Sequence, residues 1–209
     1  MLRRVLIVGG TVALLLACSK APPHPPLVSS ATVLALGDSL TYGSGASTDG
    51  AAWPALLARS TGWTVINAGV PGDTSQAALE RLPALLEEHR PQLVLVSLGG
   101  NDFLRGIAAE QTDAALRQIL VQVRSAGAKA VLVAVPRPSA IGAAIGKLSD
   151  HPLYESVAQG AGVPLLAAAW SEVLSDGAMK SDTIHANDRG YARFAELAQR
   201  RLKELGFIR

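Results

Sequence analysis

The chain has 209 residues, of which 49% are hydrophobic and 17% charged, with 20 Gly and 12 Pro. This composition excludes a disordered, collagen-like or charge-rich coiled-coil protein and fits one well-filled globular domain. The 19 Lys and Arg residues nearly balance the 17 Asp and Glu residues, so the chain lacks the basic footprint of a nucleic-acid-binding protein. The single cysteine, Cys18, excludes an internal disulfide and a cysteine-based zinc site.

The first 30 residues have the pattern of an export signal followed by a tether. Arg3 and Arg4 precede a short apolar run, which has fewer than the roughly 20 residues that span a bilayer. We therefore expect residues 1–17 to be removed as a signal peptide, which leaves 17 basic against 17 acidic residues. Residues 18–30 are rich in Pro and are expected to form a semi-rigid spacer. A single domain is expected over residues 31–209.

The end of the signal segment, Leu15-Leu16-Ala17-Cys18, resembles the bacterial lipobox. In that motif the leader is cut before a cysteine that is lipidated. The resemblance implies a lipid anchor at Cys18 and a domain that faces the periplasm or the cell exterior. For a Gram-negative source, which the family pattern implies, the outer membrane is favoured because Ser19, rather than Asp, follows the cysteine. An ordinary signal peptide with a chance cysteine is the alternative.

From residue 32 onward, short apolar strands alternate with segments of helical spacing. The predicted strands are 32–36, 64–67, 93–98, 130–135 and 163–166, and the predicted helices are 52–58, 76–86, 112–124, 153–159 and 188–205. Continuously apolar strands rich in β-branched residues are typical of a parallel sheet that is buried on both faces. The alternation predicts an α/β fold with about five parallel strands and helices on both sides.

Small polar residues follow the ends of the first three predicted strands. Ser39 lies in Gly37-Asp38-Ser39-Leu40, Gly72 in the next such loop, and Asn101 in Gly99-Gly100-Asn101-Asp102. In a parallel sheet these loops meet at the carboxyl edge, where ligands bind. Each segment taken alone is more typical of turn and helix-cap chemistry than of a catalytic site.

His185 is the best candidate for a general base among the four histidines. Asp182 precedes it by three residues on the loop before the last predicted helix. A carboxylate at this position can orient the imidazole and stabilise its cation. The other histidines, His24, His89 and His151, are expected to be exposed side chains.

The order of these segments resembles that of the SGNH, or GDSL, hydrolase family, in its bacterial thioesterase/lysophospholipase/arylesterase branch. The resemblance covers about residues 32–205 and implies a flavodoxin-like three-layer α/β/α sandwich. It also implies a serine esterase that needs no metal or organic cofactor. In that family pattern Ser39 is the nucleophile, His185 the base and Asp182 the residue that orients it. The oxyanion hole would comprise the backbone N–H groups of Ser39 and Gly72 and the side-chain amide of Asn101.

The sequence departs from the family pattern at two places. Ala186 stands where the family commonly has Pro, and the stretch Pro138–Pro152 has fewer polar groups than the family's substrate loop. Apolar residues near the predicted site suggest a groove for a hydrocarbon or aromatic acyl group, although packing beneath the loops explains them equally well: Leu40, Val70, Phe103, Ile107, Ile141 and Ile145. We expect a carboxylester hydrolase, with thioesters and lysophospholipids as further candidate substrates.

Three other functions stay open at this point. A carbohydrate or cell-wall O-acetyl esterase is disfavoured because only 4% of the residues are aromatic. A flavodoxin-like nucleotide or flavin binder would require a phosphate loop, which the sequence lacks. A catalytically silent binding lipoprotein is disfavoured because every reactive position of the family pattern is filled. The expected partners are a small-molecule ester and the membrane that holds the anchor, with no nucleic acid and a monomer favoured.

Overall fold

The computed structural model describes residues 24–139, 142 and 145–209. The predictions for the signal peptide, for Cys18 and for Ile141 fall outside these ranges. Five parallel strands form one sheet in the order β2-β1-β3-β4-β5. They are β1 (Thr32–Gly37), β2 (Thr64–Gly69), β3 (Leu93–Ser97), β4 (Lys129–Val133) and β5 (Leu165–Leu166). The predicted parallel sheet is confirmed, and its strand order is that of flavodoxin-like folds.

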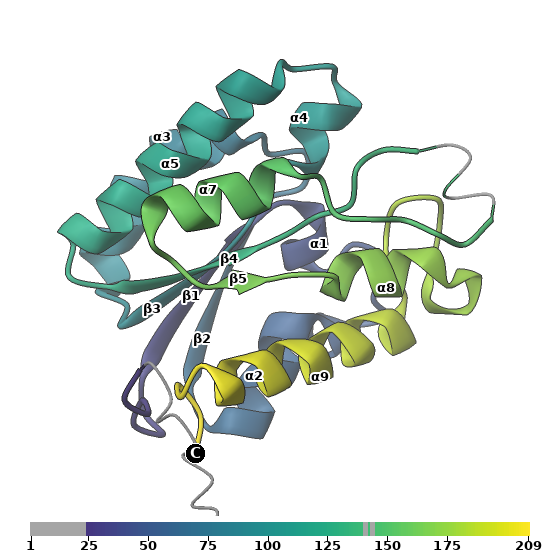
Figure 1. Ribbon diagram of the computed structural model, residues 1–209. Coiled ribbons are helices and arrows are strands. Elements are labelled where there is room, and N and C mark those ends of the chain that lie inside the picture. The colour runs from purple at the N-terminus through teal and green to yellow at the C-terminus, as the bar shows by residue number, and fades with distance from the viewer. Residues whose placement is uncertain (1–23, 140–141, 143–144) are drawn as a thin grey trace, which may run out of the picture.

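Helices cover both faces of this sheet, which completes the expected three-layer sandwich (Figure 1). One face carries α3 (Ser75–His89), α5 (Ala109–Ser125) and α7 (Leu153–Ala161), and the other carries α2 (Trp53–Thr61) and α9 (Asp188–Glu204), with α8 (Ala169–Ser175) beside α9. Two short helices follow strands directly, α1 (Ser39–Tyr42) after β1 and α4 (Gly100–Leu104) after β3. Single 3-10 turns occur at Asp49–Ala51 and Gly177–Met179.

The core lies on both sides of the central strands. All five residues of β3 are buried, as are the last five of β1, which explains why these strands read as continuous apolar runs. One face of α9 is buried, including Tyr191, Phe194 and Leu202, and its Phe194 stacks on Trp170 of α8 with ring centroids 3.8 Å apart. The ring of Trp53, on α2, packs against the same phenylalanine with centroids 5.2 Å apart. Aromatic packing therefore joins the three helices of this face.

The register of the sheet places the ends of its central strands side by side. Gly37, the last residue of β1, is paired with Gly69 of β2 and with Ser97 of β3. The chain moves to opposite sides of β1 when it continues into β2 and β3. The loops that follow these strands therefore border the crevice where doubly wound sheets bind ligands.

The described start of the chain lies against the C-terminal residues, at the opposite end of the sheet (Figure 1). The His24 N–H donates to the Leu205 carbonyl at 3.1 Å, and the His24 ring stacks on Phe207 at 4.5 Å. His24 is thus half-buried rather than exposed as expected. Burial and the nearby charge of Lys129 lower the pKa of its ring. Residues 24–30 were predicted as the second half of the tether, but His24 and Leu27 contact the C-terminal residues of the domain.

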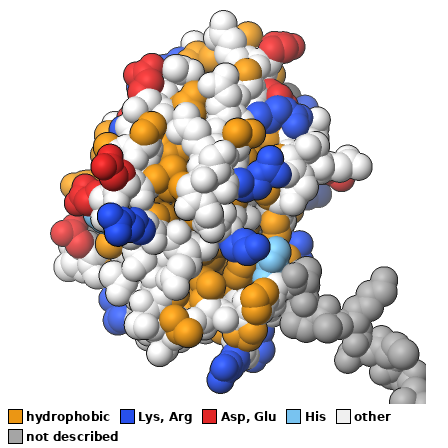
Figure 2. Space-filling model, turned by 90° about the vertical axis from the view of Figure 1, so that its left-hand side faces the viewer, with side chains coloured by type: hydrophobic (Ala, Val, Ile, Leu, Met, Phe, Trp, Pro, Cys, Tyr) orange, Lys and Arg blue, Asp and Glu red, His pale blue; other side chains and the backbone are white. Residues whose placement is uncertain are grey.

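The surface near this start of the described chain mixes apolar and charged side chains, with several Lys and Arg among them (Figure 2). Within the described ranges, no helix has both the length and the apolar character that crossing a membrane requires.

Candidate active site

Ser39 lies at the sharp turn between β1 and α1, as the first residue of that helix. The Asp38 carboxylate caps the turn, because its Oδ1 accepts a hydrogen bond from the Leu40 N–H at 3.0 Å. A side chain at Gly37 would collide with Thr41 of α1, so glycine is what lets the helix fold back over the end of the strand. This turn leaves Ser39 half-buried at the carboxyl edge of the sheet.

The loop before α9 brings His185 and Asp182 to the serine. The Nε2 atom of His185 is 3.0 Å from Ser39 Oγ, and its Nδ1 atom is 2.7 Å from Asp182 Oδ2. The second carboxylate oxygen, Oδ1, accepts the N–H groups of Ile184 and His185, each at 2.8 Å. These bonds fix the carboxylate to the main chain of its own loop. The three side chains therefore form one hydrogen-bonded line, although 146 residues separate the serine from the histidine.

The hydrogen bonds around Asp182 keep it ionised. Its partial burial acts to raise the pKa, but the hydrogen bond from the His185 ring and the two main-chain N–H donors outweigh this effect and lower the pKa.

Ala186, at the position where the family commonly has Pro, is fully buried. An isolated β-bridge between Ala186 and Lys180 holds this loop in place.

Asn101 and Gly72 lie on the loops after β3 and β2, next to the serine. The Asn101 amide donates to the main-chain carbonyl of Asp73 at 2.9 Å and to Asp38 Oδ2 at 3.4 Å. Gly72 has a φ of +84°, a conformation that favours glycine. In the described part of the chain, neither the Ser39 N–H nor the Gly72 N–H donates to a protein acceptor. Both groups can therefore bind an oxygen atom of a ligand.

Two arginines that the sequence analysis did not assign to the site hold these loops together. Arg81 of α3 donates to the Asp73 carboxylate at 2.7 Å and to the carbonyls of Gly37 and Ala68 at 3.0 and 2.8 Å. Arg105 donates to the Gly72 carbonyl at 2.7 Å. Most of these acceptors are main-chain carbonyls, which every residue has, so the sequence contained no signal for the pairing.

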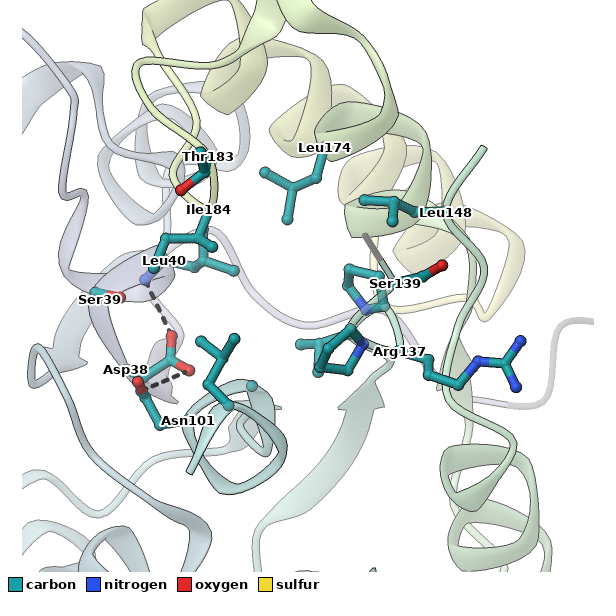
Figure 3. Close-up of a pocket in the computed structure, with 15 residues that line it drawn as sticks. Asp38, Ser39, Leu40, Asn101, Arg137, Ser139, Leu148, Leu174, Thr183 and Ile184 are labelled. Atoms are coloured by element: carbon teal, nitrogen blue, oxygen red, sulfur yellow. Dashed lines mark hydrogen bonds between the residues drawn. The ribbon is translucent and has the colours of Figure 1, made fainter. Parts of the chain in front are cut away.

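A cavity of about 310 Å³ opens beside Ser39. Figure 3 shows Ser39, Asp38 and Leu40 on one side of it, with Leu174, Leu148 and Ser139 across from them. Most of the side chains that line it are apolar, among them Leu40, Leu104, Val135, Leu148, Leu174 and Ile184. An apolar substituent bound here would have its reactive group next to the serine.

The predicted apolar groove is correct in kind but differs in its residues. Of the described residues that were expected to form it, Leu40 lines the cavity. Phe103 stacks instead on the ring of His151, with centroids 4.3 Å apart, and Ile107 lines a separate cavity. Val70 and Ile145 are exposed to 41% and 63%. The prediction failed because it selected apolar residues by their position on a loop, which does not determine where a side chain points.

The chain is similar to characterised hydrolases over most of its length. Residues 35–193 match the GDSL-like Lipase/Acylhydrolase family. The chain is 42% identical over 179 residues to the thioesterase 1/protease 1/lysophospholipase L1 of Escherichia coli (strain K12), which covers 83% of this chain and 84% of that protein. It is 32% identical over 186 residues to an arylesterase of Vibrio mimicus, covering 85% of this chain and 91% of the arylesterase.

Solved structures agree with this assignment. A crystal structure of TesA superposes with a TM-score of 0.74 at 33% identity and covers 83% of this chain and 99% of its own. The psychrotrophic esterase EstA from Pseudoalteromonas sp., inhibited by monoethylphosphonate, superposes with a TM-score of 0.71 at 25% identity and covers 83% and 97%. The matched segment includes Ser39, Asp182 and His185. This match and the relatives show that the chain belongs to the GDSL-like lipase/acylhydrolase family.

Proposed function

We propose that this protein hydrolyses carboxylic esters through an acyl-enzyme formed on Ser39, with His185 as general base and Asp182 as its orienting carboxylate. The observation that carries the proposal is the line from Ser39 Oγ to His185 Nε2 at 3.0 Å and from His185 Nδ1 to Asp182 Oδ2 at 2.7 Å. A serine hydroxyl is a weak nucleophile at neutral pH and needs a base within hydrogen-bond reach. This geometry supplies one.

The reaction runs in two halves. Ser39 Oγ attacks the ester carbonyl carbon while its proton passes to His185 Nε2, and the carbonyl oxygen becomes an oxyanion. The intermediate then collapses, the bond to the leaving oxygen or sulfur breaks, and the imidazolium returns its proton to the leaving group. Water repeats the sequence on the acyl-enzyme and releases the acid. Asp182 stays ionised throughout, as its lowered pKa supports.

The oxyanion would be bound by three donors, the N–H groups of Ser39 and Gly72 and the amide of Asn101. Donors that are already oriented toward the developing charge typically contribute factors of about a hundred to a thousand each. The left-handed backbone at Gly72 and the arginine that holds its carbonyl support this role, because they fix the direction of the loop.

The cavity supports an apolar acyl group as the preferred substrate feature. Its volume of about 310 Å³ lies at the small end of the range for small-molecule pockets, which is roughly 300 to 1,000 Å³. This favours short to medium acyl chains or an aryl group over long chains. Thioesters and lysophospholipids are further candidates, supported by the names of the Escherichia coli relative.

We further propose that the mature protein is lipid-anchored at Cys18 and faces the periplasm or cell exterior. The lipobox-like sequence around the single cysteine supports this placement.

The test of the activity combines active-site labelling with substrate profiling. An organophosphonate should add one group, which peptide mass spectrometry should locate on Ser39. Ser39→Ala should lose labelling and hydrolysis, whereas Ser60→Ala, a substitution on α2 away from the cavity, should keep both. Matched esters and thioesters of increasing acyl length then give the preference. Undiminished hydrolysis by Ser39→Ala would contradict the proposal.

A further inference from the structure

Asp38 is a buried carboxyl group at the floor of the site for which the triad and the oxyanion donors leave no role. Its residue is 3% exposed, and it lines the cavity immediately before the nucleophile (Figure 3). One oxygen, Oδ1, accepts the Leu40 N–H at 3.0 Å. The other, Oδ2, lies 3.4 Å from the Asn101 amide nitrogen. A buried carboxylate with so few donors is costly, so its retention beside the reacting groups requires an explanation.

Several titratable groups face Asp38 from the elements packed around it. His185 approaches from the loop before α9, Asp102 from α4, Tyr154 from α7 and Tyr191 from α9. Burial raises the pKa of Asp38 to about 7, aided by the charge of Asp102 and opposed by the Leu40 N–H and by His185. The guanidinium group of Arg81, on the same side of the site, is bonded to the Asp73 carboxylate and to two main-chain carbonyls.

The Asn101 amide can occupy its place in two orientations that differ by exchange of its oxygen and nitrogen. In the observed orientation the NH2 group faces two acceptors, the Asp73 carbonyl and the Asp38 carboxylate. The flipped orientation would put the amide oxygen against both acceptors, which is repulsive. The ionised Asp38 therefore disfavours the flipped amide. A protonated Asp38 could instead donate to the amide oxygen, which would offset part of the repulsion from the Asp73 carbonyl and make the flipped orientation less unfavourable.

We propose that Asp38 is a positioning residue for ester hydrolysis, whose carboxylate form keeps the NH2 group of Asn101 directed toward the oxyanion. In the flipped orientation the Asn101 oxygen would face the substrate's carbonyl oxygen and repel the developing charge. The long 3.4 Å contact leaves the amide hydrogen available to the oxyanion when it forms. The inference rests on the proposed function and adds the ionisation of Asp38 to that of His185 as a requirement for hydrolysis.

Asp38→Asn is the matched variant. An asparagine oxygen can keep the cap on the Leu40 N–H, while its NH2 group would meet the NH2 group of Asn101, so only the orienting contact is lost. We expect kcat to fall by roughly ten- to a hundredfold, as for the loss of a hydrogen bond to a charged group. KM should change by less than about twofold, because Asn101 acts mainly on the transition state.

The pH profile separates positioning from a purely structural role. In the wild-type enzyme, kcat/KM should rise with pH along a limb steeper than one proton, because both His185 and Asp38 must lose a proton, and then level off. In Asp38→Asn the limb should have one-proton slope. Equal one-proton slopes in both enzymes would overturn the proposal. An alkaline decline that Asp38→Asn abolishes would also overturn it, since the neutral acid would then be the working form.

A double-mutant cycle tests whether Asp38 acts through Asn101. In an Asn101→Ala background, Asp38→Asn should cost less than about twofold in kcat, because its target is already absent. Additive effects of the two substitutions would contradict positioning through Asn101.

A measurement without substrate keeps this inference distinct from the proposed activity. In 15N-labelled Ser39→Ala protein, the side-chain amide signals of Asn101 should shift with one ionisation near pH 7, and this shift should vanish when Asp38→Asn is added. If the protein hydrolyses no ester, the proposed function fails while the amide titration still decides the Asp38 contact. An amide that does not titrate overturns the inference even if hydrolysis is normal.

Discussion

The two aspartates nearest the reacting groups have opposite pKa shifts because their surroundings differ. Asp182 has a side chain that is 52% exposed and accepts three hydrogen bonds, so its pKa is lowered. Asp38 is buried with one close N–H donor, so its pKa rises to about 7. Pairs of carboxyl groups separated in this way can take different roles at one pH.

Asp182→Asn should abolish most of the activity with little loss of stability. The asparagine oxygen can still accept the N–H groups of Ile184 and His185, but its NH2 group would face Nδ1 of the imidazole. That atom would then have to be unprotonated, which puts the proton on Nε2 and prevents it from accepting the Ser39 proton. The wrong tautomer costs roughly 10⁴-fold in kcat in serine enzymes. Steady-state kinetics and thermal melts check this, and near-normal kcat would show that another group orients His185.

Asp38→Asn should stabilise the fold at pH 8 more than at pH 4. The folded-state pKa of Asp38, about 7, lies above its ordinary value of 3.8. Protonated Asp38 therefore contributes its full stability below about pH 4, and the wild-type protein loses this contribution as the pH rises through 7, whereas the variant does not. The difference between the two pKa values corresponds to a change of about 4 kcal/mol at most in the free energy of unfolding. Denaturant unfolding at the two pH values measures the difference, with Asp49→Asn, an exposed site, as the control for charge. A pH-independent difference would contradict the raised pKa.

At the scale of elements, the sequence predicted those strands and helices whose apolar residues form a continuous or periodic pattern. The five strands and the long helices were found because their apolar residues repeat over at least seven positions or run without interruption. The short helices α1 and α4, with four and five residues, are too short to show a helical period, and α8, with seven residues, was not predicted either. The fifth strand was predicted over four residues but pairs over two, and Pro164 before it has no N–H to donate.

At the site, residue type and spacing singled out His185 with Asp182, and the resemblance to the SGNH family pattern assigned Ser39, Gly72 and Asn101. The structure brings Ser39, His185 and Asp182 within hydrogen-bond distance. Arg81 and Arg105 were missed because they bind mainly main-chain carbonyls. The orienting contact of Asp38 depends on the approach of α4 to the end of β1, and sequence spacing contains no measure of that distance.

Gly72, in the loop after β2, is a position where an added methyl group should be strained. Gly72 has a φ of +84°, and a Cβ there would lie 3.3 Å from Arg105 Nη2. Gly72→Ala should therefore strain the loop and displace both its N–H and the arginine that holds it. We expect kcat to fall at least tenfold, with about 1 kcal/mol lost in stability.

Gly106→Ala is the matched control for backbone strain. Gly106 has a φ of +67° with open space around its Cβ position, so alanine should cost similar stability while leaving the oxyanion donors in place. Measured kcat should separate the two variants although their melting temperatures are similar. Equal kcat values would show that Gly72 only shapes the loop.

At the scale of the whole molecule, the site and the start of the described chain lie at opposite ends of the sheet (Figure 1). Ser39 follows the carboxyl end of β1, whereas His24 is bonded to Leu205 near the end of α9. The chain between Cys18 and His24 can span at most about 20 Å. If Cys18 is lipidated as proposed, the amino end of the sheet stays near the membrane and the cavity opens away from it. The enzyme would then meet esters from the aqueous side.

This arrangement gives the last prediction. Cys18→Ser should move the protein from the membrane to the soluble fraction, because each buried CH₂ of an acyl chain holds it with about 0.8 kcal/mol.

In the anchored protein the chain's only native cysteine is acylated, so an introduced cysteine can be labelled selectively. Val28→Cys and Leu104→Cys place a fluorophore at exposed positions, 61% and 53%, near the two ends of the sheet. Quencher lipids in reconstituted vesicles should quench the label at Val28 more strongly than the label at Leu104. A Cys18→Ser protein that stays in the membrane fraction refutes the anchor, and equal or reversed quenching refutes the orientation, because a domain held by its amino end cannot bring both labels equally close to the bilayer.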